Sequence, residues 1–392
     1  MKGRIITAAF ALTALVAAGC GSSNSSSSTS SAAAGSGTST SASTKACAAT
    51  IGIEGPFTGD VAVLGQEQLA FAKLAIDMDN KANGTNITLV QGDTQLDPAQ
   101  ATTVTQQFTS NSKMVAVVGP AGSQEVQAVG PLFGRAGMPF ITGSATNPDL
   151  TTSGKNPTFF RVVSRDDLQG PEDAHYIVKN LKPKRLMIID DQEVYSTGLV
   201  SAMTPVFKQA GIQVDHESVS QKVTDFSSLV AKITPETTVV VLPWQVAANA
   251  QQFGKNLAEQ KKKATIFGTD GTYSSSFSIP GSYVSAFGPD INSIPADAAI
   301  ATAAKAAYPK YGTFGPPVFA ATHVIDQAIS SVCKSGQTPS RANVLAAIKS
   351  TSEASSILGQ PIKFDNHGDL IGAKWFLFKI NDKGQYKLVT NT

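Results

Sequence analysis

The feature that most constrains the fold of this 392-residue chain is a regular alternation of short apolar segments with longer amphipathic ones. Residues 50–53 and 114–118 are apolar and bounded by turn residues, which is typical of strands buried in a parallel sheet. Residues 66–81 carry an apolar stripe and are followed by Asn83-Gly84, a typical end of a helix. The alternation therefore predicts an α/β fold with helices on both faces of parallel sheets.

The strand and helix pattern occurs twice. Each run covers about 110 residues, and a body of about 345 residues is large for one hydrophobic core, so we predict two doubly wound lobes. The expected strands are 50–53, 87–90, 114–118, 139–142, 185–189, 212–219, 238–242, 265–267, 362–365, 375–380 and 386–389, and residues 159–163 are expected to cross between the lobes. The expected helices are 66–81, one that Asp97 caps, one that Ser123 caps, 195–210, 225–233, 246–261, 295–308, 316–334 and 340–349.

The first residues have the pattern of an export signal. Lys2 and Arg4 precede an apolar run, 5–18, that is too short to span a bilayer comfortably. The run ends in small residues before Cys20, which resembles the lipobox of bacterial lipoproteins. The resemblance implies a signal peptide at 1–19 and a lipid on Cys20. The alternative is an ordinary secretory leader that contains a cysteine.

Residues 20–47 are rich in Ser, Gly, Ala and Thr and predict a flexible tether, because they have no large apolar groups to bury. The formal charge of +2 becomes 2 − 2 = 0 when the leader, with its two basic residues, is removed. The only basic clusters, 182–185 and 261–263, lie at the ends of expected helices, where lysine is ordinary. We therefore predict no nucleic-acid partner.

The chain has 3 cysteines, and the lipid accounts for Cys20. In an oxidising compartment the remaining two, Cys47 and Cys333, favour one disulfide. The alternative is two separate buried thiols.

The sequence lacks the common reactive motifs. It has no G-x-S-x-G, P-loop, G-x-G-x-x-G after a strand, or C-x-x-C. The 4 histidines, His175, His216, His323 and His367, are scattered without metal-ligand spacing. We therefore predict a binding protein without metal, cofactor or catalytic residues. A lipoprotein hydrolase remains the rival from another class, and turnover of amino acid amides would favour it.

Four segments together resemble the branched-chain amino acid-binding proteins of bacterial importers, which have the type I periplasmic-binding fold. They are 51–59, 92–98, 144–148 and 165–171. The resemblance covers nearly the whole body and implies two lobes joined by a three-segment hinge. It implies a first lobe of 48–161 and 286–360 and a second lobe of 162–285 and 361–392.

The resemblance also implies how the first lobe holds the ligand. Ser123 matches the position whose hydroxyl binds the ligand carboxylate, at a helix N-terminus that favours an anion. Ser144, Ala145 and Thr146 match the loop that supplies a backbone carbonyl, a hydroxyl and a backbone N–H. The alternatives are a simple helix cap for Ser123 and a plain turn for the loop.

In the second lobe the resemblance implies contacts from Tyr195, Trp244 and Asp270, which all follow expected strands. Asp270 matches a glutamate that binds the ligand ammonium. Its side chain is one methylene shorter, so the expected contact either runs through a water molecule or leaves room for a bulkier ligand. Leu64 stands where some relatives have an aromatic residue. The alternative role of Trp244 is packing in the core. The alternative role of Asp270 is that of a helix cap or turn residue.

The sequence thus predicts an extracytoplasmic, lipid-anchored solute-binding protein of an ABC importer. Its lobes would close on an amino acid with an apolar or branched side chain, and its partners would be the permease and its ATPase. We expect a monomer that touches the membrane only through its lipid. The alternative function is a sensor or carrier of the same fold for an amide, urea or another small polar solute.

Overall fold

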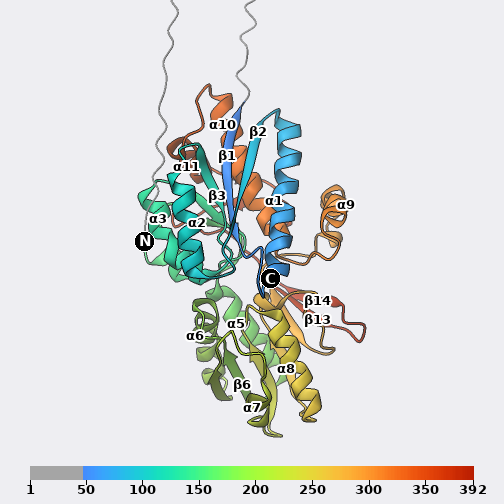
Figure 1. Cartoon of the computed structure of the whole chain (residues 1–392). Coiled ribbons are helices and arrows are strands. Elements are labelled where there is room, and N and C mark those ends of the chain that lie inside the picture. Colours follow the sequence, from blue (N-terminus) through green and yellow to red (C-terminus); the bar gives the residue numbers. More distant parts are fainter. Residues whose placement is uncertain (1–46) are drawn as a thin grey trace, which may run out of the picture. The chain divides into compact units, whose positions relative to one another are not determined.

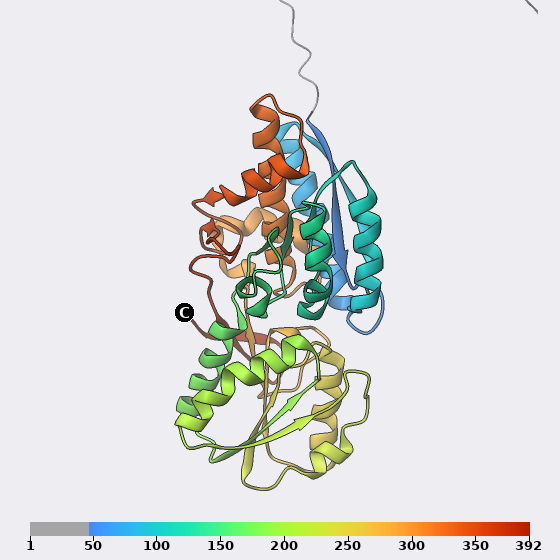
Figure 2. The same cartoon turned by 90° about the vertical axis from the view of Figure 1, so that its left-hand side faces the viewer.

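The computed structural model describes residues 47–392. The predicted signal peptide, Cys20 and the tether up to residue 46 lie outside the described residues. Two main sheets organise the described part, and helices cover both faces of each (Figures 1 and 2).

The first sheet has five parallel strands in the order β2-β1-β3-β4-β5. Its strands are β1 Ala48–Gly55, β2 Asn86–Asp93, β3 Met114–Val118, β4 Phe140–Thr142 and β5 Phe159–Arg161. The helices around it are α1 Ala62–Asn83, α2 Pro98–Ser110, α3 Ser123–Arg135, α4 Asp149–Thr152, α9 Ala298–Ala307, α10 Gly315–Lys334 and α11 Arg341–Lys349. A small antiparallel pair, β11 Ser352–Glu353 and β12 Ile362–Lys363, follows them.

The second sheet has the order β14-β13-β10-β9-β8-β6-β7, with β13 and β14 antiparallel to their neighbours. Its strands are β6 Arg185–Asp190, β7 Gln213–Ser218, β8 Thr237–Leu242, β9 Thr265–Gly268, β10 Tyr283–Ala286, β13 Phe376–Ile380 and β14 Tyr386–Asn391. Its helices are α5 Asp166–Tyr176, which continues as a π-helical turn to Leu181, α6 Val194–Gln209, α7 Ser227–Ala231 and α8 Ala247–Glu259.

Alternation of side chains along the strands explains why both faces are covered. In β3, Val118 packs in a core with α1 and α10, whereas Val117, the residue before it, packs with α2 and α3. Figure 1 shows these helix pairs around the first sheet. Because every second side chain of a strand points to the same face, a fully apolar strand needs a helical layer on each side. The predicted α/β class with two parallel-sheet lobes is confirmed.

Helix ends follow the local sequence, with one correction. Asp97 caps α2 as predicted, since its carboxylate accepts the backbone N–H groups of Ala99 and Gln100 at 2.8 and 3.0 Å. The predicted cap of α3 was wrong by one residue. Gly122 is the N-cap and its N–H donates to the Glu125 carboxylate at 2.7 Å, so Ser123 is the first helical residue.

Strand β10 and helix α5 are among the elements that were not predicted. Strand β10 lies between β9 and β13, and α5 begins at Asp166 with two acidic residues in its first turn. The second lobe was expected to resume at residue 361, but Ile362 and Leu370 still pack in the core of the first sheet. The chain reaches the core of the second sheet at Trp375.

A disulfide joins Cys47 to Cys333, with the Cα atoms 5.8 Å apart. It links the residue before β1 to the last turn of α10. Across residues 47–392, no helix combines the length and hydrophobicity needed to cross a bilayer.

Candidate ligand-binding site

The loops after the carboxyl ends of the two sheets face each other across a cleft. Gln124, in α3, donates a side-chain hydrogen bond to Gln245 at 2.9 Å, and Asn147 donates to the backbone oxygen of Val194 at 3.1 Å. A cavity of about 280 Å³ opens between the same groups of loops, with Leu64 on one side and Tyr273 on the other. Gln245 and Gly271 line it, next in sequence to Trp244 and Asp270, whereas the predicted ligand contacts themselves lie outside its lining. Ligands bind at this end of doubly wound sheets, so the cleft is the candidate site.

On the first-sheet side, Ser123 is 1% exposed at the start of α3. Because Gly122 caps the helix, the Ser123 hydroxyl is not used for capping. It accepts the Asn147 backbone N–H at 3.2 Å. The free N–H groups of a helix's first turn carry partial positive charge. This corner of the cleft therefore favours an anion, as predicted for a ligand carboxylate.

The loop after β4 adds Ser144, Ala145 and Thr146, all buried. The Ser144 hydroxyl donates to the Ala121 carbonyl at 2.8 Å and accepts from the Gln68 amide at 2.9 Å. It is therefore committed within the protein. The Thr146 hydroxyl is buried and has no hydrogen-bond partner among the described residues. Of the predicted hydroxyl groups in this loop, Thr146 is the one left for a ligand.

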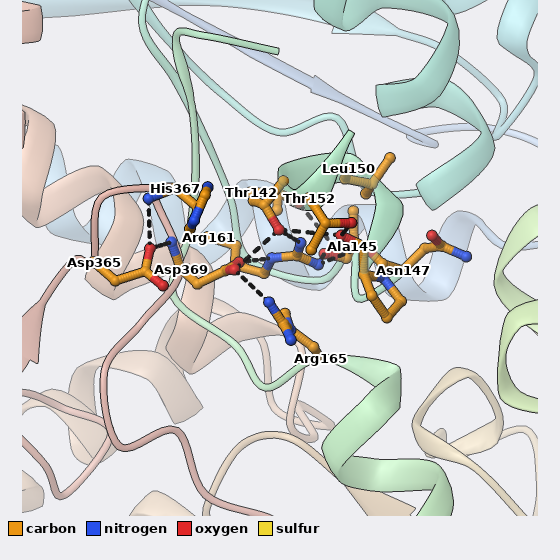
Figure 3. Close-up of polar contacts among 12 residues, drawn as sticks. Thr142, Ala145, Asn147, Leu150, Thr152, Arg161, Arg165, Asp365, His367 and Asp369 are labelled. Carbon is orange, nitrogen blue, oxygen red and sulfur yellow. Dashed lines mark hydrogen bonds and ion pairs between the residues drawn. The ribbon is translucent and has the colours of Figure 1, made fainter. Parts of the chain in front are cut away.

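Arg161 fixes the backbone of this loop from behind (Figure 3). Its guanidinium donates to the carbonyl groups of Ala145 and Asn147 at 3.1 and 2.9 Å, on either side of Thr146. Its Nε donates to Asp369 at 2.6 Å. Arg165 also donates to Asp369, at 2.9 Å. The ligand loop, the last turn before α5 and a late segment of the chain therefore share one buried ionic network.

On the second-sheet side, Asp270 begins a short 3-10 turn directly after β9 and is 2% exposed. Its Oδ1 accepts hydrogen bonds from the Gln169 amide at 2.6 Å and the Tyr195 hydroxyl at 2.7 Å. Both partners are neutral. Burial raises the pKa of Asp270 to about 6, and the two hydrogen bonds oppose that rise. A cation would relieve the cost of ionising this carboxyl group.

Tyr195 and Trp244, both predicted to touch the ligand, have different positions. The Tyr195 hydroxyl bonds to Asp270 and to Thr269 at 2.6 Å, so it orients the carboxylate. The Trp244 ring lies in the core of the second sheet, 4.9 Å from the Phe226 ring, and its N–H donates to the Ile189 carbonyl at 2.6 Å. The structure therefore places the Trp244 side chain with core residues, which was the alternative.

Sequence reasoning did not single out Arg161, Asp166 or Gln169. Arg161 is the charged residue in the otherwise apolar segment 159–163, which was expected to be a crossover, and it is fully buried. Asp166 and Gln169 lie inside one of the four segments that carried the resemblance. A charge within an apolar run was thus the available signal for Arg161.

The family model described as periplasmic binding protein matches residues 48–385. The chain belongs to the periplasmic binding protein family. Proteins of this family are extracytoplasmic binding proteins of transport systems, and the family is not an enzyme family. No group of three or more metal-ligating side chains occurs in residues 47–392 of this member.

Relatives and solved structures of the family are similar over most of the chain. An "Amino acid binding protein" of Pseudomonas aeruginosa is 29% identical, covering 86% of this chain and 91% of the relative. A Leu/Ile/Val-binding protein of Rhizobium johnstonii is 28% identical over 84% and 91%. A leucine-binding protein of Thermotoga maritima shares the fold, with a TM-score of 0.78, 19% identity and coverage of 88% and 98%. A benzoate complex of a Rhodopseudomonas palustris solute-binding protein also has a TM-score of 0.78, with 18% identity over 88% and 96%.

Proposed function

We propose that this protein binds an amino acid with an apolar side chain and delivers it to an ABC importer. The observation that carries the proposal is Asp270, a buried carboxylate directly before Gly271 of the cavity lining, whose hydrogen-bond partners are neutral. A closed cleft excludes water, so this group calls for a positive charge on the ligand. The anion-favouring start of α3, at Ser123, lies on the opposite side.

An apolar cluster beside the site supports the class of side chain. Its members are Val61, Leu64, Leu96, Ala121 and Val246. Val246 belongs to the second-sheet side and the others to the first, so the cluster joins the two sides. Burying an aliphatic side chain here would contribute roughly 1.5–3 kcal/mol. Relatives that are a Leu/Ile/Val-binding protein and a leucine-specific-binding protein point to the same class.

The mechanism we propose is hinge closure. One lobe would be the part built on the first sheet and the other the part built on the second sheet, with the ligand held by both. A ligand that contacts both lobes favours the closed state by its differential affinity. Small-angle scattering should show a smaller radius of gyration with saturating ligand, and an unchanged radius would argue against closure.

We also propose that Cys20 carries a lipid and that the protein acts as a monomer beside its permease and ATPase. Detergent-phase partitioning should retain the wild-type protein, and a Cys20→Ser variant should move to the aqueous phase. The protein should release no product from amino acid amides, because its proposed role is binding alone.

A thermal-shift screen against amino acids, amides, urea and aromatic acids tests the ligand class. A ligand at 100 times its dissociation constant stabilises the folded protein by about 2.7 kcal/mol. We expect leucine, isoleucine or valine to give the largest shift. A larger shift with an amide or urea would contradict the proposed amino acid importer and favour a sensor or carrier for small polar solutes.

A further inference from the structure

A second cavity lies on the first-sheet side, toward the end of α1 that is farther from the cleft. It has a volume of about 340 Å³ and opens between α1, α9, α10 and the segment 353–362, and Figure 1 shows α9 beside α1. The cleft cavity touches α1 up to Glu67, whereas this one touches Met78 and Ala82. An α-helix rises about 1.5 Å per residue, so Glu67 and Met78 are about 16 Å apart along its axis. The two cavities share no lining residue, and this one is large enough for a small molecule.

Apolar side chains form much of the wall of this second cavity. Ile300 comes from α9, Phe319 from α10, and Ile357 and Ile362 from the late segment. Phe319, Ile357 and Ile362 are buried, whereas Met78 of α1 is partly exposed. A wall of this kind favours the carbon part of a ligand, because binding removes apolar surface from water.

Acidic side chains meet the apolar wall. Asp79, Asp297 and Glu353 come from three separate segments and line the same cavity. Asp297 is 5% exposed, and its Oδ2 is buried without a hydrogen-bond partner in residues 47–392. Buried carboxylate oxygens in native proteins are nearly always paired, so an unpaired one in the wall of a cavity points to a donor on a ligand.

Acids outnumber bases around this cavity, and its lining contains no lysine or arginine. Asp79 is paired with His323, whose Nδ1 lies 2.8 Å from Oδ2. Neither Asp297 nor Glu353 forms an ion pair in the described part of the chain. Asp326, three residues after His323 in α10, is 1% exposed, and neither of its oxygens has a hydrogen-bond partner within residues 47–392. Burial raises the pKa of all three acids without an ion pair, and a nearby cation would favour their ionised forms.

We propose that this cavity binds an organic cation, with its ammonium group on Asp297 and Glu353 and its apolar stem on the wall around Phe319. The apolar wall favours a carbon stem over a bare metal ion, and residues 47–392 contain no group of three or more side chains that could hold a metal. The site is separate from the cleft and goes beyond the proposed function. It would give the protein a second small-molecule ligand.

Calorimetry with three probes of similar size tests the requirement for a cation. 2-Phenylethylamine has a cation on an apolar stem, 2-phenylethanol has the stem without a charge, and 3-phenylpropanoate has the stem with an anion. The variants Asp297→Asn and Glu353→Gln each remove one proposed acceptor. The matched control is Asp77→Asn, which removes the same charge from an exposed position of α1. Asp270→Ala separates binding in this cavity from binding in the cleft.

We expect the amine to bind wild type at least tenfold more tightly than the alcohol, and 3-phenylpropanoate to bind most weakly. Asp297→Asn and Glu353→Gln should each weaken the amine by about tenfold, the effect of losing a hydrogen bond to a charged group, and leave the alcohol within about twofold. Asp77→Asn and Asp270→Ala should leave the amine within about twofold of wild type. The melting temperature and leucine affinity of Asp297→Asn should match those of wild type, which would exclude unfolding and damage to the cleft.

Three results would overturn the inference. They are an amine that binds no more tightly than the alcohol, equal losses in Asp297→Asn and Asp77→Asn, and amine binding that Asp270→Ala abolishes. The last result would place the amine in the cleft. If leucine does not bind but amine binding still depends on Asp297 and Glu353, the proposed function fails and the inference stands.

Discussion

The two sides of the cleft differ in both charge and support. The ligand contacts that we propose on the first-sheet side are the uncharged hydroxyls of Ser123 and Thr146, and a buried ionic network supports the backbone around Thr146. On the second-sheet side the facing group is a carboxylate, Asp270, and neutral side chains hold it. On the first-sheet side the buried charges, Arg161 and Asp369, pair with each other. On the second-sheet side the charge of Asp270 is left for the proposed ligand.

This difference explains how one small cleft can bind both ends of a zwitterion. A helix N-terminus stabilises an anion without a formal charge of its own, so the first-sheet side needs no basic side chain facing the ligand. For the ligand cation, the proposed contact on the second-sheet side is an acidic side chain, Asp270. Stability should therefore depend most on charge in the first-sheet side, and affinity on charge in the second.

The largest effect on stability should come from Asp369→Ala. The change leaves Arg161 buried without its acid, and breaking a buried ion pair from one side typically costs about 3–5 kcal/mol. Urea unfolding of the ligand-free protein would measure it. Asp167→Ala, which breaks the exposed pair with Arg165, should cost less than 1 kcal/mol. Equal losses of unfolding free energy in the two variants would contradict the claim that the buried ionic network stabilises the first-sheet side.

Loss of the disulfide should be the next largest effect. A Cys47→Ser/Cys333→Ser double variant removes a link between β1 and α10, and such losses typically cost about 2–4 kcal/mol of unfolding free energy. Because the link lies on the first sheet, away from the cleft loops, ligand affinity should stay within twofold. A large loss of affinity would show that the site depends on the whole first sheet.

Affinity should rise about tenfold between pH 5 and pH 7. Burial raises the pKa of Asp270 to about 6 in the folded, ligand-free protein. Below that value the carboxyl group is protonated and cannot pair with an ammonium, and above it the ionised form is present. The same raised pKa means that ligand-free stability falls as pH rises from about 4, the ordinary value of the carboxyl group, to about 6, and is level above that. Affinity that is flat with pH, or falls, would contradict the role of this carboxylate.

The smallest effect should come from Trp244→Phe. The ring still packs against Phe226, but the hydrogen bond to the Ile189 carbonyl is lost, at a cost of about 1 kcal/mol of stability. Affinity should not change, since the Trp244 side chain lies in the core. A loss of affinity larger than the loss of stability would restore Trp244 to the ligand contacts.

Much of the fold could be predicted from local sequence. Apolar runs such as 114–118 and strong caps such as Asp97 contain enough information to locate their elements. Strand β10 was missed because Tyr283–Ala286 is a short segment with a polar Ser285, and its pairing with β13 joins residues far apart in the chain. Long-range pairing of this kind leaves little local signal.

The site was predictable in outline but not in its division of roles. Their positions directly after expected strands, in register with the family, made Ser123, Tyr195, Trp244 and Asp270 candidate ligand contacts. Which side chains turn into the core depends on neighbours such as Phe226 that come from distant segments. The Arg161 network likewise needs Asp369, which is 208 residues away in sequence.

Binding of L-leucine, leucinamide and 4-methylpentanoate to wild type, Asp270→Ala and Ser123→Ala would decide whether the two sides hold opposite ends of one ligand. Asp270→Ala should lose about 2–5 kcal/mol for leucine and leucinamide and little for 4-methylpentanoate. Ser123→Ala should weaken leucine and 4-methylpentanoate by about 1.5–3 kcal/mol and spare leucinamide. If Asp270→Ala binds leucine within about threefold of wild type, less than 1 kcal/mol, the ammonium is held elsewhere and the proposed division of the cleft is wrong.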